Sequence, residues 1–196
     1  MKFDELNQLK RYFSIMELPQ QDKDKRVSLG LAFYDIFIYV FILMQAEVKI
    51  KGSIDVDYYV RSLDGRIRDA LEENNIPYED DYIPQLTRDI VETTTRHLDE
   101  PYYFSEERAL LVAQNEANTV LNGFDYEQAK SKGKTHKTWV TEQDDKVRPW
   151  HAEVDLVTIP IDDMFHVGED YMRFPHDFMN GSPDNLINCR CTCKYE

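Results

Sequence analysis

The chain has 196 residues, of which 42% are hydrophobic and 12% aromatic, and it carries a formal net charge of −14. This length and apolar content exclude a disordered chain and are sufficient for one domain, or for a helical part with a small second part. The acidic charge excludes a general affinity for nucleic acid, because most of the surface repels phosphates, and it favours basic partners.

Apolar residues recur at helical spacing throughout the first 130 residues. Prolines and polar turns divide this part of the chain. The pattern therefore predicts five helices, with Ser53 as the expected cap of the third. They are expected at about residues 3–16, 22–48, 53–73, 84–98 and 105–129.

The second predicted helix contains an apolar run, residues 27–44, that is almost long enough to cross a membrane. Asp35 lies within this run, and an ionised carboxylate is costly in lipid. We therefore expect a buried helix, or a helix that docks on a partner, in a protein without membrane association. The charged, amphipathic N-terminal sequence is unlike a signal peptide, so we expect synthesis in a reducing cytoplasm.

Helical spacing ends near residue 131. Short apolar runs at residues 137–140 and 154–159 predict strands, and prolines with turn-forming neighbours predict many loops. The expected fold class is α+β. We expect an N-terminal helical bundle over residues 1–130, followed by a small, loop-rich, β-containing domain over residues 131–196.

The three cysteines lie close together, at positions 189, 191 and 193, and such an odd, clustered set is a poor disulfide framework. Cys189 and Cys191 with His151 and His176 offer two thiolates and two imidazoles, a ligand set that suits zinc. The alternative is that both cysteines share one face of a terminal strand and pack as small apolar groups. In that alternative, His151 holds a loop through a hydrogen bond.

Arg148 and Arg190 are candidates for bidentate ion pairs with the carboxylates of Asp145, Asp177 or Asp184. Such pairs would hold together the loops of a small domain with a limited core. The alternative is that both arginines face a partner or DNA.

Four lysines form a local basic stretch in this otherwise acidic chain: Lys130, Lys132, Lys134 and Lys137. They are candidate contacts to DNA phosphates, and the alternative is a solvated linker.

Four features occur in order over roughly residues 105–195. A helix reads RALLVAQNE from Arg108, and a strand contains Trp139. A segment then reads DKVRPWH up to His151, and a proline-rich stretch closes with Asn-Cys-Arg-Cys at residues 188–191. This ordered set resembles the Mu F-like family of phage minor head (head morphogenesis) proteins. The structural positions of the motif are Trp139, Arg148, Asn188 and Arg190.

The resemblance implies a non-enzymatic structural protein of a tailed phage virion, at the portal vertex or the capsid interior. Its expected role is in head assembly, DNA packaging or ejection, with the portal protein, other capsid proteins and packaged DNA as expected partners. The alternative is a metal-dependent hydrolase or nuclease that uses His151, His176 and the C-terminal cysteines. The sequence has no phosphate-binding glycine loop, no HExxH motif and no serine nucleophile elbow.

Overall fold

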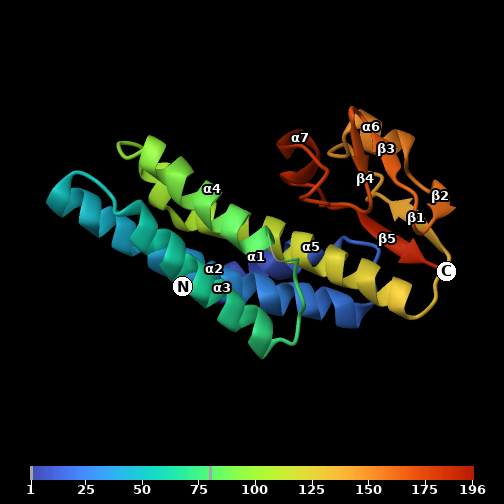
Figure 1. Ribbon diagram of the computed structural model, residues 1–196, viewed down its shortest axis with the longest axis horizontal. Helices are drawn as coiled ribbons and strands as arrows, with labels where there is room; N and C mark the ends of the chain where they lie inside the picture. Colours follow the sequence, from blue (N-terminus) through green and yellow to red (C-terminus); the bar gives the residue numbers. More distant parts are fainter. Residues whose placement is uncertain (1, 80) are drawn as a thin grey trace. The chain divides into compact units, whose positions relative to one another are not determined.

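The computed structural model describes residues 2–79 and 81–196, without the side chains of residues 2 and 3 (Figure 1). Five long helices account for most of the first two thirds of the chain. They are α1 (Lys2–Ser14), α2 (Gln20–Lys51), α3 (Val56–Glu73), α4 (Tyr82–Arg96) and α5 (Glu106–Ser131), with a 3-10 helix at Pro101–Phe104.

The rest of the chain is rich in short elements. It contains the helices α6 (Pro149–Glu153) and α7 (Pro183–Leu186), and the strands β1 (His136–Val140), β2 (Thr158–Pro160), β3 (Phe165–Val167), β4 (Asp170–Met172) and β5 (Thr192–Tyr195). This arrangement confirms the predicted α+β fold class.

Contacts divide the chain into two compact units. Unit 1 comprises Met1–Val27 and Asn115–Glu196, and unit 2 comprises Ser28–Gln114. Both α2 and α5 therefore contribute residues to each unit. The predicted domain boundary at residue 131 coincides with the end of α5. It differs from the division into units 1 and 2 and stays a prediction.

The helix α2 buries one face although its sequence is apolar all round. Its buried residues recur every three or four positions, as Leu29, Phe33, Phe37, Val40 and Met44 do. By length and composition the helix is apolar enough to cross a membrane. Of its most apolar 18-residue stretch, 44% is buried inside the protein. The expected lack of membrane association stays a prediction.

In unit 2, α3 and α4 pack against each other. The helix α3 begins after Asp55, whose side chain accepts a hydrogen bond from the backbone N–H of Tyr58 at 3.0 Å. Asp55 is therefore the cap, and the expectation of Ser53 was wrong by two residues. A capping carboxylate satisfies one of the free amides in the first turn and also complements the helix dipole.

Unit 1 contains a three-stranded antiparallel sheet in the order β2-β1-β5 and a hairpin of β3 and β4. Trp139 of β1 is fully buried and packs with Phe165, Val167 and Met172. Cys189 and Cys191 belong to the same core cluster. The segment that carries the cysteines therefore lies against the apolar face of these short strands.

The predicted strand at residues 154–159 was wrong for its first half. Residues 154–156 form a turn after α6, and the strand β2 includes only residues 158–160. The backbone of Leu156 has a positive φ of 59°, and its N–H donates to the carbonyl of Trp139 at 2.8 Å. A residue in this left-handed conformation interrupts an extended strand.

Candidate functional site

A row of asparagines on α5 holds the C-terminal segment of unit 1. Asn115, Asn118 and Asn122 are three and four residues apart, so they share one face of the helix. Their side chains bond to the backbone of residues 188–191: to the N–H of Asn188 (2.9 Å), the carbonyl of Cys189 (3.4 Å) and the carbonyl of Cys191 (3.3 Å). The backbone of both cysteines is therefore fixed from one side by α5.

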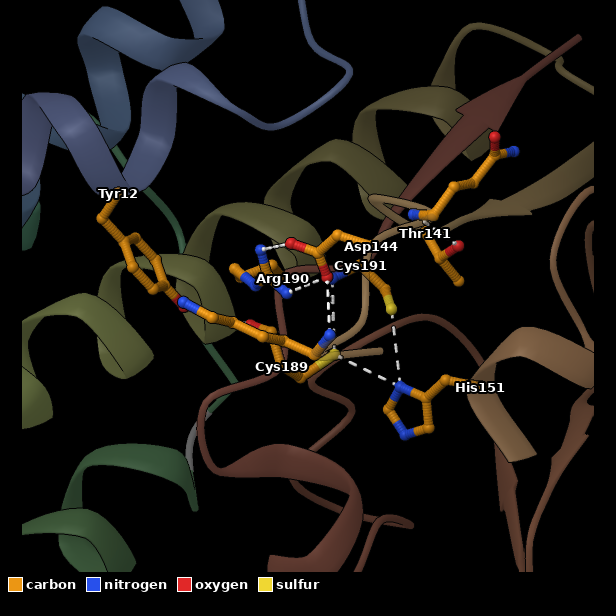
Figure 2. A network of polar contacts seen from close by, with 9 residues as sticks. Tyr12, Thr141, Asp144, His151, Cys189, Arg190 and Cys191 are labelled. Carbon is orange, nitrogen blue, oxygen red and sulfur yellow. Dashed lines mark hydrogen bonds and ion pairs between the residues drawn. The ribbon is translucent and has the colours of Figure 1, made fainter. Parts of the chain in front are cut away.

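On this fixed segment, the two cysteine sulfur atoms lie near one imidazole nitrogen. Nδ1 of His151, on α6, lies 3.4 Å from Sγ of Cys191 and 3.7 Å from Sγ of Cys189 (Figure 2). All three side chains are buried, and their donor atoms lie within 4.8 Å of one another. The structure thus brings together three of the four predicted metal ligands.

The side chain of Asn185 fixes the orientation and the tautomer of His151. Its Oδ1 accepts hydrogen bonds from Nε1 of Trp150 at 2.6 Å and from Nε2 of His151 at 2.9 Å. Its Nδ2 donates to the carbonyl of Val167 at 3.0 Å and to Asp170 at 2.7 Å. Because an indole N–H only donates, this amide orientation makes Nε2 of His151 a donor. In the neutral imidazole, Nδ1 then has a free lone pair directed at the two sulfurs.

Trp150 is itself held in place by a close backbone approach. Gly168 has a φ of +63°, and a Cβ atom at this position would lie 3.2 Å from the indole ring of Trp150. Any other residue would be strained by the positive φ, and its Cβ atom would crowd the ring, so glycine is favoured at this position. The absence of a side chain at Gly168 therefore leaves room for the indole ring of Trp150.

A pocket beside the two cysteines is lined by Glu142, Arg190 and His151, among other residues. Oε1 of Glu142 is buried and has no hydrogen-bond partner among the described residues. Burial raises the pKa of this carboxyl group to about 7. Oε1 of Glu142 is therefore a carboxylate oxygen without a hydrogen-bond partner among the described residues, on a residue that lines the same pocket as the two cysteines.

Arg190 forms two hydrogen bonds with the carboxylate of Asp144, both at 2.7 Å. These bonds lower the pKa of Asp144 to about 2. The predicted bidentate pair therefore exists, but the predicted partners Asp145, Asp177 and Asp184 were wrong for Arg190. The loop after β1 carries Asp144 to the cysteine segment, and sequence proximity alone does not reveal which of the neighbouring aspartates points there.

The two central thiols have opposite pKa shifts. The neighbouring Cys191 thiol lowers the pKa of Cys189 well below its ordinary value, and His176 and His151 act in the same direction. The same neighbour interaction and burial raise the pKa of Cys191. Burial also raises the pKa of Cys193 to about 12. A thiolate at Cys189 is therefore the charged form that this cluster favours.

His176 is not a member of the three-residue cluster. Its Nε2 lies 2.7 Å from the carbonyl oxygen of Cys189, and its Nδ1 lies 3.4 Å from Oγ1 of Thr119. Its backbone has a φ of 64°. Both ring nitrogens are thus engaged in holding the chain. The next residue, Asp177, is fully buried and accepts two hydrogen bonds from the guanidinium of Arg173, at 2.9 and 2.6 Å.

The remaining motif residues have structural contacts. Trp139 packs edge-to-face on His151, with ring centroids 5.7 Å apart. Arg148 donates to the carbonyl of Ile187, and it pairs with no aspartate among the described residues. Asn188 has a left-handed φ of 58°, a conformation that asparagine tolerates well. The alternative for the cysteines was wrong about the terminal strand, because β5 begins at Thr192. Both cysteines do pack in an apolar core cluster, and His151 does form a hydrogen bond, to Asn185.

The four lysines predicted to contact DNA lie in different environments. Lys137 is fully buried, with its Nζ 4.9 Å from the ring centroid of Tyr126, so it is not available to phosphates. Lys130 forms an ion pair with Asp162 at 2.7 Å. Lys132 and Lys134 are exposed, and Lys132 donates to Gln128.

Comparison with known families identifies the class of protein. The family described as Phage Mu protein F like protein matches residues 78–194, which is more than half of the chain. The chain therefore belongs to this family. It is a phage head morphogenesis protein, associated with the virion and made in the host. No curated protein and no solved structure matches the chain.

Sequence reasoning missed the residues that arrange the cluster. Asn185 lies in the proline-rich stretch of the ordered set, but its contact with His151 was not predicted, and no motif marks Asp170 or Glu142. The asparagines of α5 could have been recognised from the sequence, because three of them recur at helical spacing among the apolar residues of that helix. Polar residues on a buried helical face require hydrogen-bond partners. Because these asparagines share one face, their spacing predicts that they bond to one neighbouring segment.

Proposed function

We propose that this protein is a structural minor component of the phage head, at the portal vertex or the inner face of the capsid. It acts in head assembly, DNA packaging or ejection and has no catalytic role. The observation that carries the proposal is the family match, which includes the whole strand-rich segment to residue 194. The resemblance in the Asn-Cys-Arg-Cys segment lies within this match.

The surface of unit 1 supports contacts with other proteins. Several large apolar side chains are exposed between residues 156 and 187: Leu156, Val157, Met164, Tyr171, Met179 and Ile187. Such side chains favour protein contacts where they gather into one patch. The net charge of −14 favours a partner with a basic surface over bare nucleic acid.

The portal protein is the first partner to test. We would mix the full chain with the portal protein of the same phage and measure the mass of the eluting species by light scattering after size exclusion. We expect one co-eluting complex that weakens at higher salt, because screening reduces attraction between opposite charges. A protein that binds neither the portal nor assembled capsid shells would contradict the proposal.

Packaged DNA is a second proposed contact, through the exposed Lys132 and Lys134. A double variant, Lys132→Glu with Lys134→Glu, should weaken the proposed binding to DNA and reduce its salt dependence. The matched control is Lys10→Glu with Lys49→Glu, which changes the net charge equally at exposed positions outside this stretch. Equal effects of both double variants would show that net charge alone is responsible.

The alternative hydrolase or nuclease function has its own test in the same preparation. DNA and ester substrates would be incubated with the chain and added zinc, magnesium or manganese. Turnover that disappears in His151→Ala, with the fold retained, would favour the enzyme. We expect no turnover, because the cluster of His151, Cys189 and Cys191 is buried in the core.

A further inference from the structure

The two nitrogen-to-sulfur separations among the three donor atoms of unit 1 match those of a tetrahedral zinc site. A nitrogen at about 2.1 Å and a sulfur at about 2.3 Å from such an ion lie roughly 3.6 Å apart. The distances from Nδ1 of His151 to the two sulfurs are 3.4 and 3.7 Å (Figure 2). An ion between these atoms would need little rearrangement of the three side chains.

The surrounding residues prepare His151 to be a ligand. The contacts of Asn185 leave the Nδ1 lone pair facing Cys189 and Cys191 and make Nε2 the donor. A hydrogen bond from the second ring nitrogen is the usual support of a metal-bound histidine, since it fixes the ring and raises ligand basicity. Asn185 is itself held by Asp170, so the support extends two residues beyond the cluster.

Glu142 is the candidate for the fourth ligand, and because its carboxylate is not among the donor atoms that lie within 4.8 Å of one another, its side chain would have to turn towards the ion. Its buried Oε1 has no hydrogen-bond partner among the described residues, and a buried carboxylate oxygen without a partner is costly. The residue lines the pocket that also contains His151, Cys189 and Cys191. A bound cation would satisfy this oxygen.

From this arrangement, we propose that His151, Cys189 and Cys191 bind one zinc ion. The side chain of Glu142 turns towards the ion as its fourth ligand, so that the ion links the loop after β1, α6 and the cysteine segment. Zinc is the expected ion because two thiolates and an imidazole are soft and borderline ligands that zinc accepts in tetrahedral geometry. The role is structural, since the ion would connect three segments that have little regular secondary structure. His176 is not a ligand in this proposal, because its ring nitrogens bond to Cys189 and Thr119.

The first experiment measures metal content. The full chain, purified under reducing conditions and supplied with zinc, is freed of excess metal and analysed by mass spectrometry of the elements. We expect about one zinc ion per chain and a clear loss of thermal stability after chelation, because metal binding is coupled to folding. A chain with all three cysteines reduced that retains no zinc would overturn the proposal. So would an intact mass that shows two missing hydrogens, which indicates a disulfide.

Variants then assign the ligands. Cys189→Ser and Cys191→Ser should lose the ion, whereas Cys193→Ser is the matched control and should retain it, because Cys193 is outside the cluster. Asn185→Ala should weaken zinc affinity roughly 10- to 100-fold through loss of support for His151. Equal loss of zinc in Cys193→Ser and Cys189→Ser would contradict the assignment.

Cobalt substitution keeps the test valid where a variant folds poorly. In the wild-type chain, cobalt should give a thiolate charge-transfer band and the strong visible absorption of tetrahedral coordination. Glu142→Gln should retain the charge-transfer band but change the visible bands, since an oxygen ligand is altered and both sulfurs remain. His176→Gln should leave both unchanged. Loss of the spectrum in His176→Gln, with circular dichroism unchanged, would replace Glu142 by His176 as the fourth ligand.

Discussion

Two residues in unit 1 occupy environments that their side chains do not favour. Leu156 has a left-handed backbone, with a φ of 59°, and its side chain is 59% exposed. Lys137 buries its ammonium group between Tyr126 and Phe165, and its Nζ has no hydrogen-bond partner among the described residues. A single substitution at either residue should therefore change the free energy of unfolding by a measurable amount.

Replacing Leu156 by asparagine should stabilise the fold. Asparagine tolerates the left-handed conformation, so relief of strain should raise the free energy of unfolding by about 1 kcal/mol. Little burial is lost, because the leucine side chain is largely exposed. Urea unfolding of Leu156→Asn and the wild type measures the change. Val157→Asn, at a neighbouring exposed position without a positive φ, should give no gain.

Lys137 should make the unfolding free energy depend on pH. Burial lowers its pKa from 10.5 to about 8, so between these values the folded chain binds fewer protons than the unfolded chain. The contribution of Lys137 to stability therefore rises with pH across this window. Lys137→Met should exceed the wild type in stability most at about pH 7, and the difference should shrink towards about pH 10.

The control for this effect is Lys132→Met, which removes an exposed lysine from the same segment. Its difference from the wild type should stay nearly constant over the same pH range. A constant difference for Lys137→Met as well would show that the ammonium of Lys137 is not desolvated.

At the scale of elements, α5 organises unit 1 through its polar face. Asn122 donates to the carbonyls of Pro175 and Cys191, and its Oδ1 accepts a hydrogen bond from the buried Arg26 at 2.8 Å. One helical side chain thus connects the C-terminal segment and the start of α2. Such a residue contributes through several partners at once, and its loss leaves each of them unsatisfied.

Asn122→Ala should therefore lower the free energy of unfolding by about 2–3 kcal/mol, because buried carbonyls and a buried guanidinium lose their partner. Glu127→Ala, on the exposed face of the same helix, is the control and should change stability by less than about 0.5 kcal/mol. Chemical denaturation measures both. A small effect for Asn122→Ala would show that water replaces the amide.

The five long helices could be predicted because their apolar residues repeat at helical spacing over many turns. Their ends could not, since a cap such as Asp55 is selected by local backbone geometry. The strands β3, β4 and β5 contain three or four residues each, too few to show an alternating pattern. At the site, residue chemistry predicted that His151, Cys189 and Cys191 lie together, and their donor atoms are within 4.8 Å of one another. That His176 lies outside this group, with its ring nitrogens at Cys189 and Thr119, depends on tertiary positions that the sequence does not show.

At the scale of the whole molecule, unit 1 is assembled from both ends of the chain. The hydroxyl of Tyr12 lies 3.2 Å from the carbonyl oxygen of Cys189, and Lys194 forms an ion pair with Glu17 at 2.8 Å. Residues 131–196 therefore receive hydrogen bonds from α1 and α5 as well as from their own strands. The predicted boundary at residue 131 separates helical from strand-rich sequence, and a fragment can test whether it also separates folding units.

We expect that residues 131–196, produced alone, do not fold. The fragment lacks the asparagine row, so the carbonyls of Cys189 and Cys191 lose buried partners. Dispersion of amide signals in a nuclear magnetic resonance spectrum, with and without zinc, measures folding. The full chain under the same conditions is the control. A well-dispersed spectrum of the fragment would establish residues 131–196 as an independent domain.

The contact between Tyr12 and Cys189 joins residues 177 positions apart in the sequence. A ribosome delivers residues in order, so α1 emerges long before the segment that it contacts. Unit 1 can close only after residue 189 has been synthesised, whereas residues 28–114 of unit 2 are available earlier. Chains interrupted before residue 189 therefore lack a closed unit 1, and cellular proteases would encounter them as incompletely folded products.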